Sequence, residues 1–196
     1  MGRLEGRTNY LDFMGLSLSV PNESIPLPEY EIPFDLVILP ELNQLISLGI
    51  GLAVWDIATK TLVHYIHCDN LKVSWDIWET NCFCASRQHN QVAIGFYGYY
   101  GKAGYKICLF DATSWSNPKW FMSDELYPNS VALSSDGKWL AATLSDNQSA
   151  RVWDTENGML VGECSADKMT TVLFSPDNQY LITGANVPDA LSLWAL

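Results

Sequence analysis

The chain has 196 residues, of which 48% are hydrophobic and 12% are aromatic, and this composition excludes a disordered protein. Its formal net charge of −11 at pH 7 argues against nucleic acid and anionic membranes as partners, since both are bound through Lys and Arg. Other proteins are the expected partners, basic segments among them, although the charge is equally well explained by solubility.

The N-terminal segment, residues 1–34, contains one predicted strand and a linker. Leu11–Val20 holds alternating apolar residues, and Pro21–Pro33 holds four prolines and three glutamates. No basic start is followed by an apolar run, so no signal peptide is predicted. No apolar stretch approaches the roughly 20 residues of a spanning helix. Five cysteines, an odd number, indicate free thiols and a cytoplasmic or nuclear location.

Further along the chain, a short apolar strand that ends in an aromatic residue recurs, in most copies followed by Asp. Its four copies are Leu52–Asp56, Ile107–Asp111, Ala150–Asp154 and Leu191–Trp194. The clearest copies lie about 40 residues apart, which is typical of a repeat architecture.

The last two copies also share a turn. A shift of 41 positions sets Ser134–Leu140 on Ser175–Leu181 and Trp153 on Trp194. Ser-Asp-Gly and Pro-Asp-Asn place Asp, Gly and Asn where chain reversal needs a positive φ or a side-chain bond to the backbone. Each copy therefore predicts short strands joined by tight turns.

Together these features resemble the WD-repeat (WD40) β-propeller family, over residues 35–196 and most specifically in the last two copies. The resemblance implies an all-β propeller or partial propeller of four-stranded antiparallel blades. It also implies a non-enzymatic module for protein–protein interaction or scaffolding, without a cofactor. The predicted domains are the segment 1–34 and four repeats at about 35–60, 61–112, 113–155 and 156–196.

One family feature is absent. Members of the family usually carry a Gly-His pair 14 residues after the Trp, and its His bonds to a Ser or Thr and the Trp of the same blade. The corresponding positions here are Asp69, Asp124 and Asp167. This predicts an incomplete network. Each Asp either caps its loop through nearby backbone amides or belongs to an acidic partner-binding rim.

A glycine-rich run at residues 95–104 contains three further candidate residues. It fails as a phosphate-binding loop, because Phe96 stands where glycine is needed and Ala103 lacks a hydroxyl. A long hairpin is predicted instead. Its Tyr97, Tyr99 and Tyr100 either contact a partner or belong to a merely irregular hairpin.

Metal binding and catalysis have little support. His and Cys residues gather between His64 and His89 but lack the paired spacing of closed zinc sites, so no metal ligand is predicted. Neither the nucleophile elbow of serine hydrolases nor a His-Glu-x-x-His motif is present, so no catalytic residue is predicted. A propeller-type hydrolase and a metal-binding variant stay open as alternatives.

The number of repeats raises a physical problem. Four is the lower limit of the roughly 4 to 8 blades of propellers, and an open array exposes an apolar face at each end. Three outcomes stay open: the repeats close on themselves, a homo-oligomer or another chain completes them, or the propeller is partial. For the first, a strand within residues 10–20 is predicted to complete the last blade.

Overall fold

The computed structural model describes residues 12–13, 16–17, 33, 35–49, 51–67, 78–98, 106–122, 126–146, 148–186 and 191–196. The regular elements in these ranges are β-strands, apart from the 3-10 helix η1 at Pro40–Leu42. The predicted all-β fold is therefore confirmed. The described residues include no helix that is long and apolar enough to span a membrane.

The strands from β3 to β17 form four antiparallel sheets in which neighbours in sequence are neighbours in space. The first sheet contains β3 (Asp35–Leu39), β4 (Gln44–Leu48), β5 (Gly51–Asp56) and β6 (Thr61–His67). The second contains β7 (Trp78–Ser86), β8 (Gln91–Gly98), β9 (Lys106–Asp111) and β10 (Lys119–Met122). The third contains β11 (Pro128–Leu133), β12 (Trp139–Leu144), β13 (Ser149–Asp154) and β14 (Leu160–Ser165). The last sheet contains β15 (Met169–Phe174), β16 (Tyr180–Ala185) and β17 (Leu191–Ala195).

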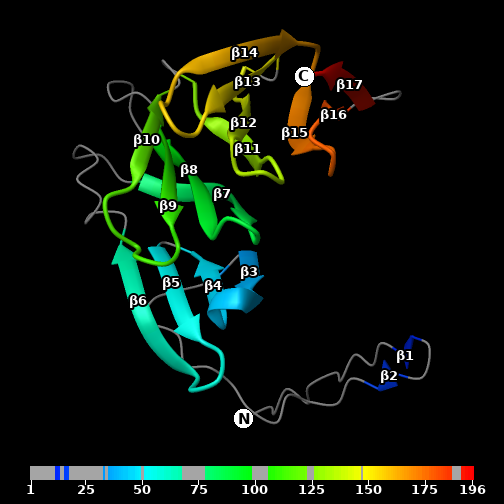
Figure 1. The fold of residues 1–196 in the computed structure, drawn as a ribbon. Helices are drawn as coiled ribbons and strands as arrows, with labels where there is room; N and C mark the ends of the chain where they lie inside the picture. Colours follow the sequence, from blue (N-terminus) through cyan, green and yellow to red (C-terminus); the bar gives the residue numbers. More distant parts are fainter. Residues whose placement is uncertain are drawn as a thin grey trace, which may run out of the picture.

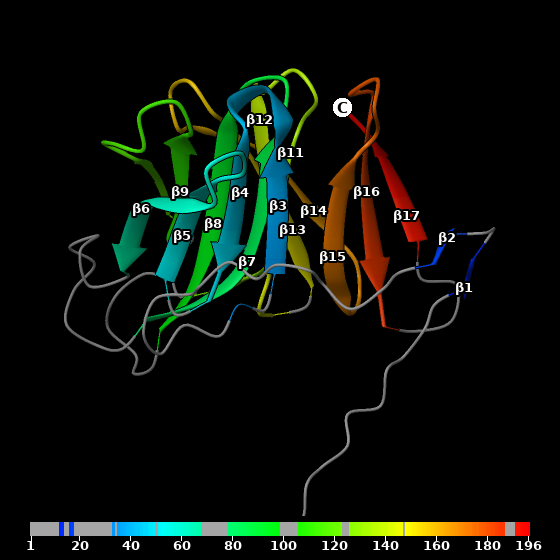
Figure 2. The same ribbon diagram turned by 90° about the horizontal axis from the view of Figure 1, so that it is seen from below.

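The sheets follow one another along an arc (Figure 1), and the first strand of each, β3, β7, β11 and β15, lies on its concave side. The turns that join β3 to β4 and β15 to β16 lie on the same side of the arc (Figure 2). This is the arrangement of propeller blades, so the predicted propeller-like fold is confirmed. Among the described residues the last sheet has three strands instead of four.

Each sequence repeat after the first contributes to two neighbouring sheets. The Trp-Asp pair ends the third strand of a sheet, and the fourth strand follows it after a tight turn, as β14 follows Asp154. The crossing to the next sheet comes after that fourth strand. A repeat that is counted from one Trp-Asp to the next thus begins with the outer strand of the preceding sheet.

The N-terminal strands pair with each other. β1 (Asp12–Phe13) and β2 (Leu16–Ser17) form a two-stranded sheet, and β17 pairs with β16 alone among the described residues. The pairing of residues 10–20 with the last sheet is therefore not among the pairings in the structure, and it stays a prediction.

The core lies between consecutive sheets, because successive side chains of a strand point to opposite faces. In β12, Leu140 and Ala142 pack toward the second sheet, and Ala141 packs toward the last sheet. A strand that is covered on both faces is buried almost continuously, as β12 is. The repeat thus builds its core by stacking.

Candidate protein-interaction surface

The Asp of the Trp-Asp pair holds the turn between the third and fourth strands. Asp56 accepts hydrogen bonds from the amide and hydroxyl of Thr59 at 2.7 and 2.8 Å, and Asp111 accepts the same pair from Thr113 at 2.8 and 2.6 Å. These bonds lower the pKa of both carboxyl groups, because they stabilise the ionised form. The turns are therefore held by carboxylates that are ionised at neutral pH.

The Trp of the pair bonds to a hydroxyl in two sheets, although the Gly-His pair of the resembled family is absent. Trp55 Nε1 donates to Ser47 Oγ at 3.3 Å in the first sheet, and Trp194 Nε1 donates to Thr183 Oγ1 at 3.0 Å in the last. Both pairs join the second and third strands of their sheet. In these two sheets the contact between the Trp and a Ser or Thr is thus kept, although the His of the family's network is absent.

The third sheet replaces this bond by apolar packing. Ala142 occupies the position of Thr183 and has no hydroxyl for Trp153. Trp153 instead packs edge-on against Phe121 of the second sheet, with ring centroids 6.5 Å apart. Its ring therefore stabilises the contact between two sheets.

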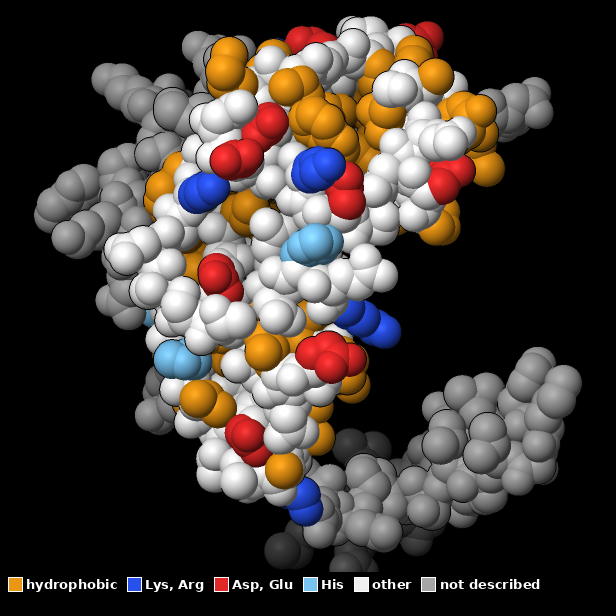
Figure 3. All heavy atoms as spheres, viewed as in Figure 1, with side chains coloured by type: hydrophobic (Ala, Val, Ile, Leu, Met, Phe, Trp, Pro, Cys, Tyr) orange, Lys and Arg blue, Asp and Glu red, His pale blue; other side chains and the backbone are white. Residues whose placement is uncertain are grey.

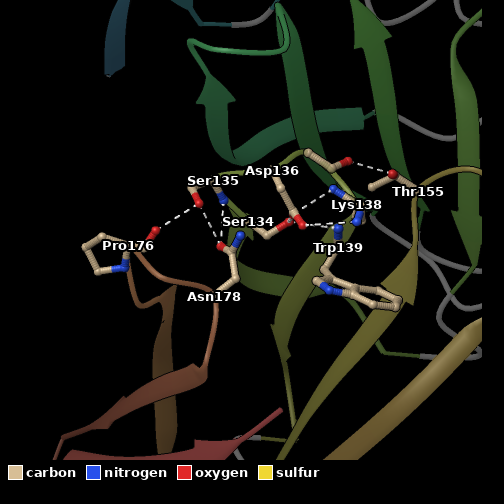
Figure 4. A network of polar contacts seen from close by, with 9 residues as sticks. Ser134, Ser135, Asp136, Lys138, Trp139, Thr155, Pro176 and Asn178 are labelled. Carbon is tan, nitrogen blue, oxygen red and sulfur yellow. Dashed lines mark hydrogen bonds and ion pairs between the residues drawn. The ribbon is translucent and has the colours of Figure 1, made fainter.

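Polar contacts link the third and last sheets along one side, which we call the turn rim (Figure 4). The Ser135 hydroxyl lies 2.9 Å from both Asn178 Oδ1 and the Pro176 carbonyl oxygen, and the Ser135 amide donates to Asn178 Oδ1 at 2.9 Å. The buried Thr155 hydroxyl donates to the Gly137 carbonyl at 2.7 Å.

The second sheet joins this rim through Lys119. Its Nζ donates to the carbonyl oxygens of Thr155 and Glu156, both at 3.0 Å. The Lys119 bonds join the second sheet to the third, and the Ser135 bonds join the third sheet to the last. Together they hold these three sheets in one relative orientation. Hydrogen bonds therefore connect three sheets along the turn rim.

The Ser-x-Asp turns have the same geometry in the last two sheets. Ser134 Oγ donates to Asp136 Oδ1 at 2.7 Å and accepts the Trp139 amide at 2.9 Å. Ser175 bonds in the same way to Asp177 and Tyr180. The turn predicted from the sequence repeat is confirmed.

Asn178 has a left-handed backbone, with φ 58°. We expect it to contribute to stability in two ways, through its hydrogen bonds to Ser135 and through its tolerance of this backbone conformation. Asn178→Gly keeps this conformation but removes the bonds to Ser135, and we expect it to lower the free energy of unfolding by about 1 kcal/mol. Asn178→Ala adds the strain of a left-handed alanine, for a total of about 2 kcal/mol. Urea unfolding measures both. If Asn178→Ala matches the wild type, the rim bonds do not contribute to stability.

On the opposite side, which we call the loop rim, β6, β8 and β14 end, and two of the sequence-predicted site residues lie there. Asp167 is exposed in the turn after β14, and its carboxylate makes no hydrogen bond to another described residue. Tyr97 lies near the end of β8. Asp69, Asp124, Tyr99 and Tyr100 lie outside the described residues. The acidic and tyrosine-rich rim therefore stays a prediction.

The last sheet presents an apolar surface that sequence reasoning missed. Its members, which we call the open face, are Leu173, Tyr180, Leu191 and Leu193, with exposed fractions between 40% and 72%. Figure 3 shows hydrophobic side chains gathered over the last two sheets, at the upper right. The sequence did contain a signal for this surface. The 41-residue shift aligns Leu173 and Leu193 with Ala132 and Val152, which are buried in the third sheet by the sheet that follows it.

The edge of the last sheet is also unprotected. In the other three sheets the third strand pairs with a fourth, whereas β17 has one neighbour among the described residues. Leu191–Ala195 contains no charged residue and no proline, the usual devices that prevent an edge strand from pairing with another chain. The edge and the open face together are suited to binding a protein.

The described cysteines are free thiols. Burial raises the pKa of Cys82 to about 12 and that of Cys108 well above its usual value, so these thiols resist ionisation. No group of three or more metal-ligating side chains comes together in the part of the chain that the structure describes. Cys68 lies outside that part.

A scan against protein families matches residues 124–154 to the WD40 family, described as WD domain, G-beta repeat. The match runs through β11, β12 and β13 and ends on Asp154, the Asp of a Trp-Asp pair. Comparison with curated proteins returns no match. Repeats of this family generally mediate protein–protein interactions and are generally not enzymes. Residues 124–154, which include the first three strands of the third sheet, are therefore similar to a WD40 repeat, at the place where the Trp-Asp pair and the Ser-Asp-Gly turn predicted one.

Proposed function

We propose that this chain is a non-enzymatic protein-interaction module and that it binds another protein through the open face. The exposure of four large apolar side chains on one sheet carries this proposal. Soluble proteins rarely leave such a contiguous surface uncovered, and larger apolar patches usually mark binding sites. The unpaired edge of β17 supports it, because a partner strand can add there by backbone hydrogen bonds.

The hydrogen bonds of the turn rim support a scaffold role. The turn rim holds three sheets in fixed orientation through Ser135, Thr155 and Lys119, so the open face is presented on a rigid body. A preorganised surface loses little conformational entropy on binding. We also propose that the acidic loop rim favours partners with basic segments. Free thiols support a location in the cytoplasm or nucleus.

We expect Leu193→Asp to abolish partner binding, because it places a charge in the middle of an apolar contact. Affinity capture of the full chain from cells, quantified by mass spectrometry, measures the effect. A loss of captured proteins of at least about tenfold is expected, which corresponds to about 1.4 kcal/mol.

Leu160→Asp is the matched control. Leu160 is also an exposed leucine on a strand, but it lies on β14, away from the open face. At a protein concentration where the chain is a monomer, both variants should unfold within about 0.5 kcal/mol of the wild type, since neither side chain is buried within one chain. Equal capture by wild type, Leu193→Asp and Leu160→Asp would contradict the proposed role of the open face.

A further inference from the structure

We propose that the open face is covered by the first sheet of a second copy of this chain, so that two copies close into one ring of eight sheets. The inference rests on the proposed function, because it assigns a partner to the same face. It starts from the two ends of the arc, which are both apolar. At the other end, β3 exposes Leu36 and Ile38, with exposed fractions of 59% and 47%.

The packing within the chain shows what such end faces bind. Where the third and last sheets meet, Val172 and Phe174 of β15 belong to one cluster with Ala132 and Val152 of the third sheet. We call the face of a sheet that points toward the preceding sheet in sequence its backward face, and the face that points toward the next sheet its forward face. The backward face of the last sheet, with Val172 and Phe174, therefore rests on the forward face of the third sheet. This contact is the template for a contact between copies.

The exposed residues of β3 occupy the template positions of β15. Leu36 pairs with Ser47, as Val172 pairs with Thr183. Ser47 and Thr183 are equivalent in turn, because each accepts the indole hydrogen bond of its sheet's Trp. Leu36 is therefore the counterpart of Val172.

The neighbouring pair gives the same result. Ile38 pairs with Leu45 in the first sheet, as Phe174 pairs with Leu181 in the last. Together, Leu36 and Ile38 have the place in the first sheet that Val172 and Phe174 have in the last sheet. The first sheet thus carries the backward face that the template requires.

The open face supplies the other half of the contact. By strand pairing, Leu191 and Leu193 hold the positions of Leu52 and Val54 in the first sheet. Leu52 and Val54 are buried against the second sheet. The last sheet thus has the same aliphatic forward face that the first sheet already uses, but without a covering sheet.

Ring closure follows from the arc. The contact joins two different faces, and such heterologous contacts either close into a ring or continue as a filament. Four sheets per copy turn the chain along an arc with β3 and β15 both on its concave side (Figure 1). Two copies place eight sheets around one axis, within the range of about 4 to 8 blades in closed propellers.

The test is the mass of the purified full chain in solution, by sedimentation velocity and light scattering. We expect twice the 21.9 kDa of one chain. Leu193→Asp and Leu36→Asp should each give monomers, because each damages both junctions of the ring. Leu160→Asp should stay a dimer.

Mixing the two monomeric variants distinguishes this ring from other dimers. An equimolar mixture of Leu193→Asp and Leu36→Asp restores one undamaged junction, so dimers should reappear. A dimer that survives Leu36→Asp would show a contact that does not use the exposed face of β3 and would overturn the ring. Urea unfolding of each variant establishes that it is folded.

The ring and the proposed function fail in different ways. A monomeric wild-type chain that still captures proteins through Leu193 overturns the ring and leaves the interaction module intact. A monomeric wild-type chain in which Leu193→Asp has no effect on capture overturns both.

Discussion

Phe110→Ala is expected to lower the free energy of unfolding by about 3–5 kcal/mol, the largest effect of any substitution considered for this chain. Phe110 takes the place of Trp in its Trp-Asp pair, and it is 1% exposed. It packs between the first and second sheets in a cluster with Ile46 and Val54. Its ring centroid lies 5.8 Å from that of Trp115.

Two contributions add up in the loss of stability at Phe110, the lost burial of the ring and the cavity that is left behind. Removing the ring forfeits its transfer from water, and the surrounding strands cannot close on the cavity because both sheets are held by their own hydrogen bonds. Urea unfolding followed by tryptophan fluorescence measures the loss. Leu160→Ala, at a residue that is 48% exposed, should change stability by no more than about 0.5 kcal/mol. A loss below about 1 kcal/mol at Phe110 contradicts the stacked core.

Gly95→Val is expected to destabilise the protein by about 3 kcal/mol through overpacking. Gly95 lies in β8 where the second and third sheets approach closely. A Cβ there would lie 2.6 Å from Pro128 Cγ and 2.7 Å from Cys82 Sγ. The Pro128 ring cannot rotate away from this Cβ, so β8 or β11 must shift to admit it.

Gly162→Val provides the matched control for this clash. Gly162 is also a strand glycine, in β14, but a Cβ there would meet no atom within 4 Å. Valine favours strands and restricts the unfolded chain more than glycine does, so a neutral or slightly stabilising effect is expected. Chemical unfolding of both variants gives the comparison. Equal effects at the two sites would show that the sheets do not approach at Gly95.

Several features of the fold were predictable from local sequence. The turn at Ser134–Trp139 follows from residue chemistry, because Ser and Asp side chains replace backbone partners in a tight reversal and Gly137 accepts φ 70°. The repeat was recognisable in the sequence because each copy needs the same residue types in its turns. Short strands between such turns then predicted four-stranded blades.

Other features were not predictable, because they depend on contacts between distant segments. The loss of the Gly-His pair predicted an incomplete network, yet nothing local indicated that Trp55 and Trp194 would keep a hydroxyl partner. Nor did the sequence repeat show that Ser135 would bond across to Asn178, 43 positions away. Such bonds exist only after two sheets have been placed side by side.

The sequence by itself determined the unit of this protein: short strands, Asp-held turns and a Trp-Asp pair, all set by interactions within a few residues. Only the tertiary structure decided how the units meet and which surface they leave uncovered. Leu173 and Leu193 are ordinary strand leucines in the sequence, and the same kind of side chain is buried at Leu52. The difference is that a neighbouring sheet covers Leu52, whereas no sheet packs on Leu193 among the described residues.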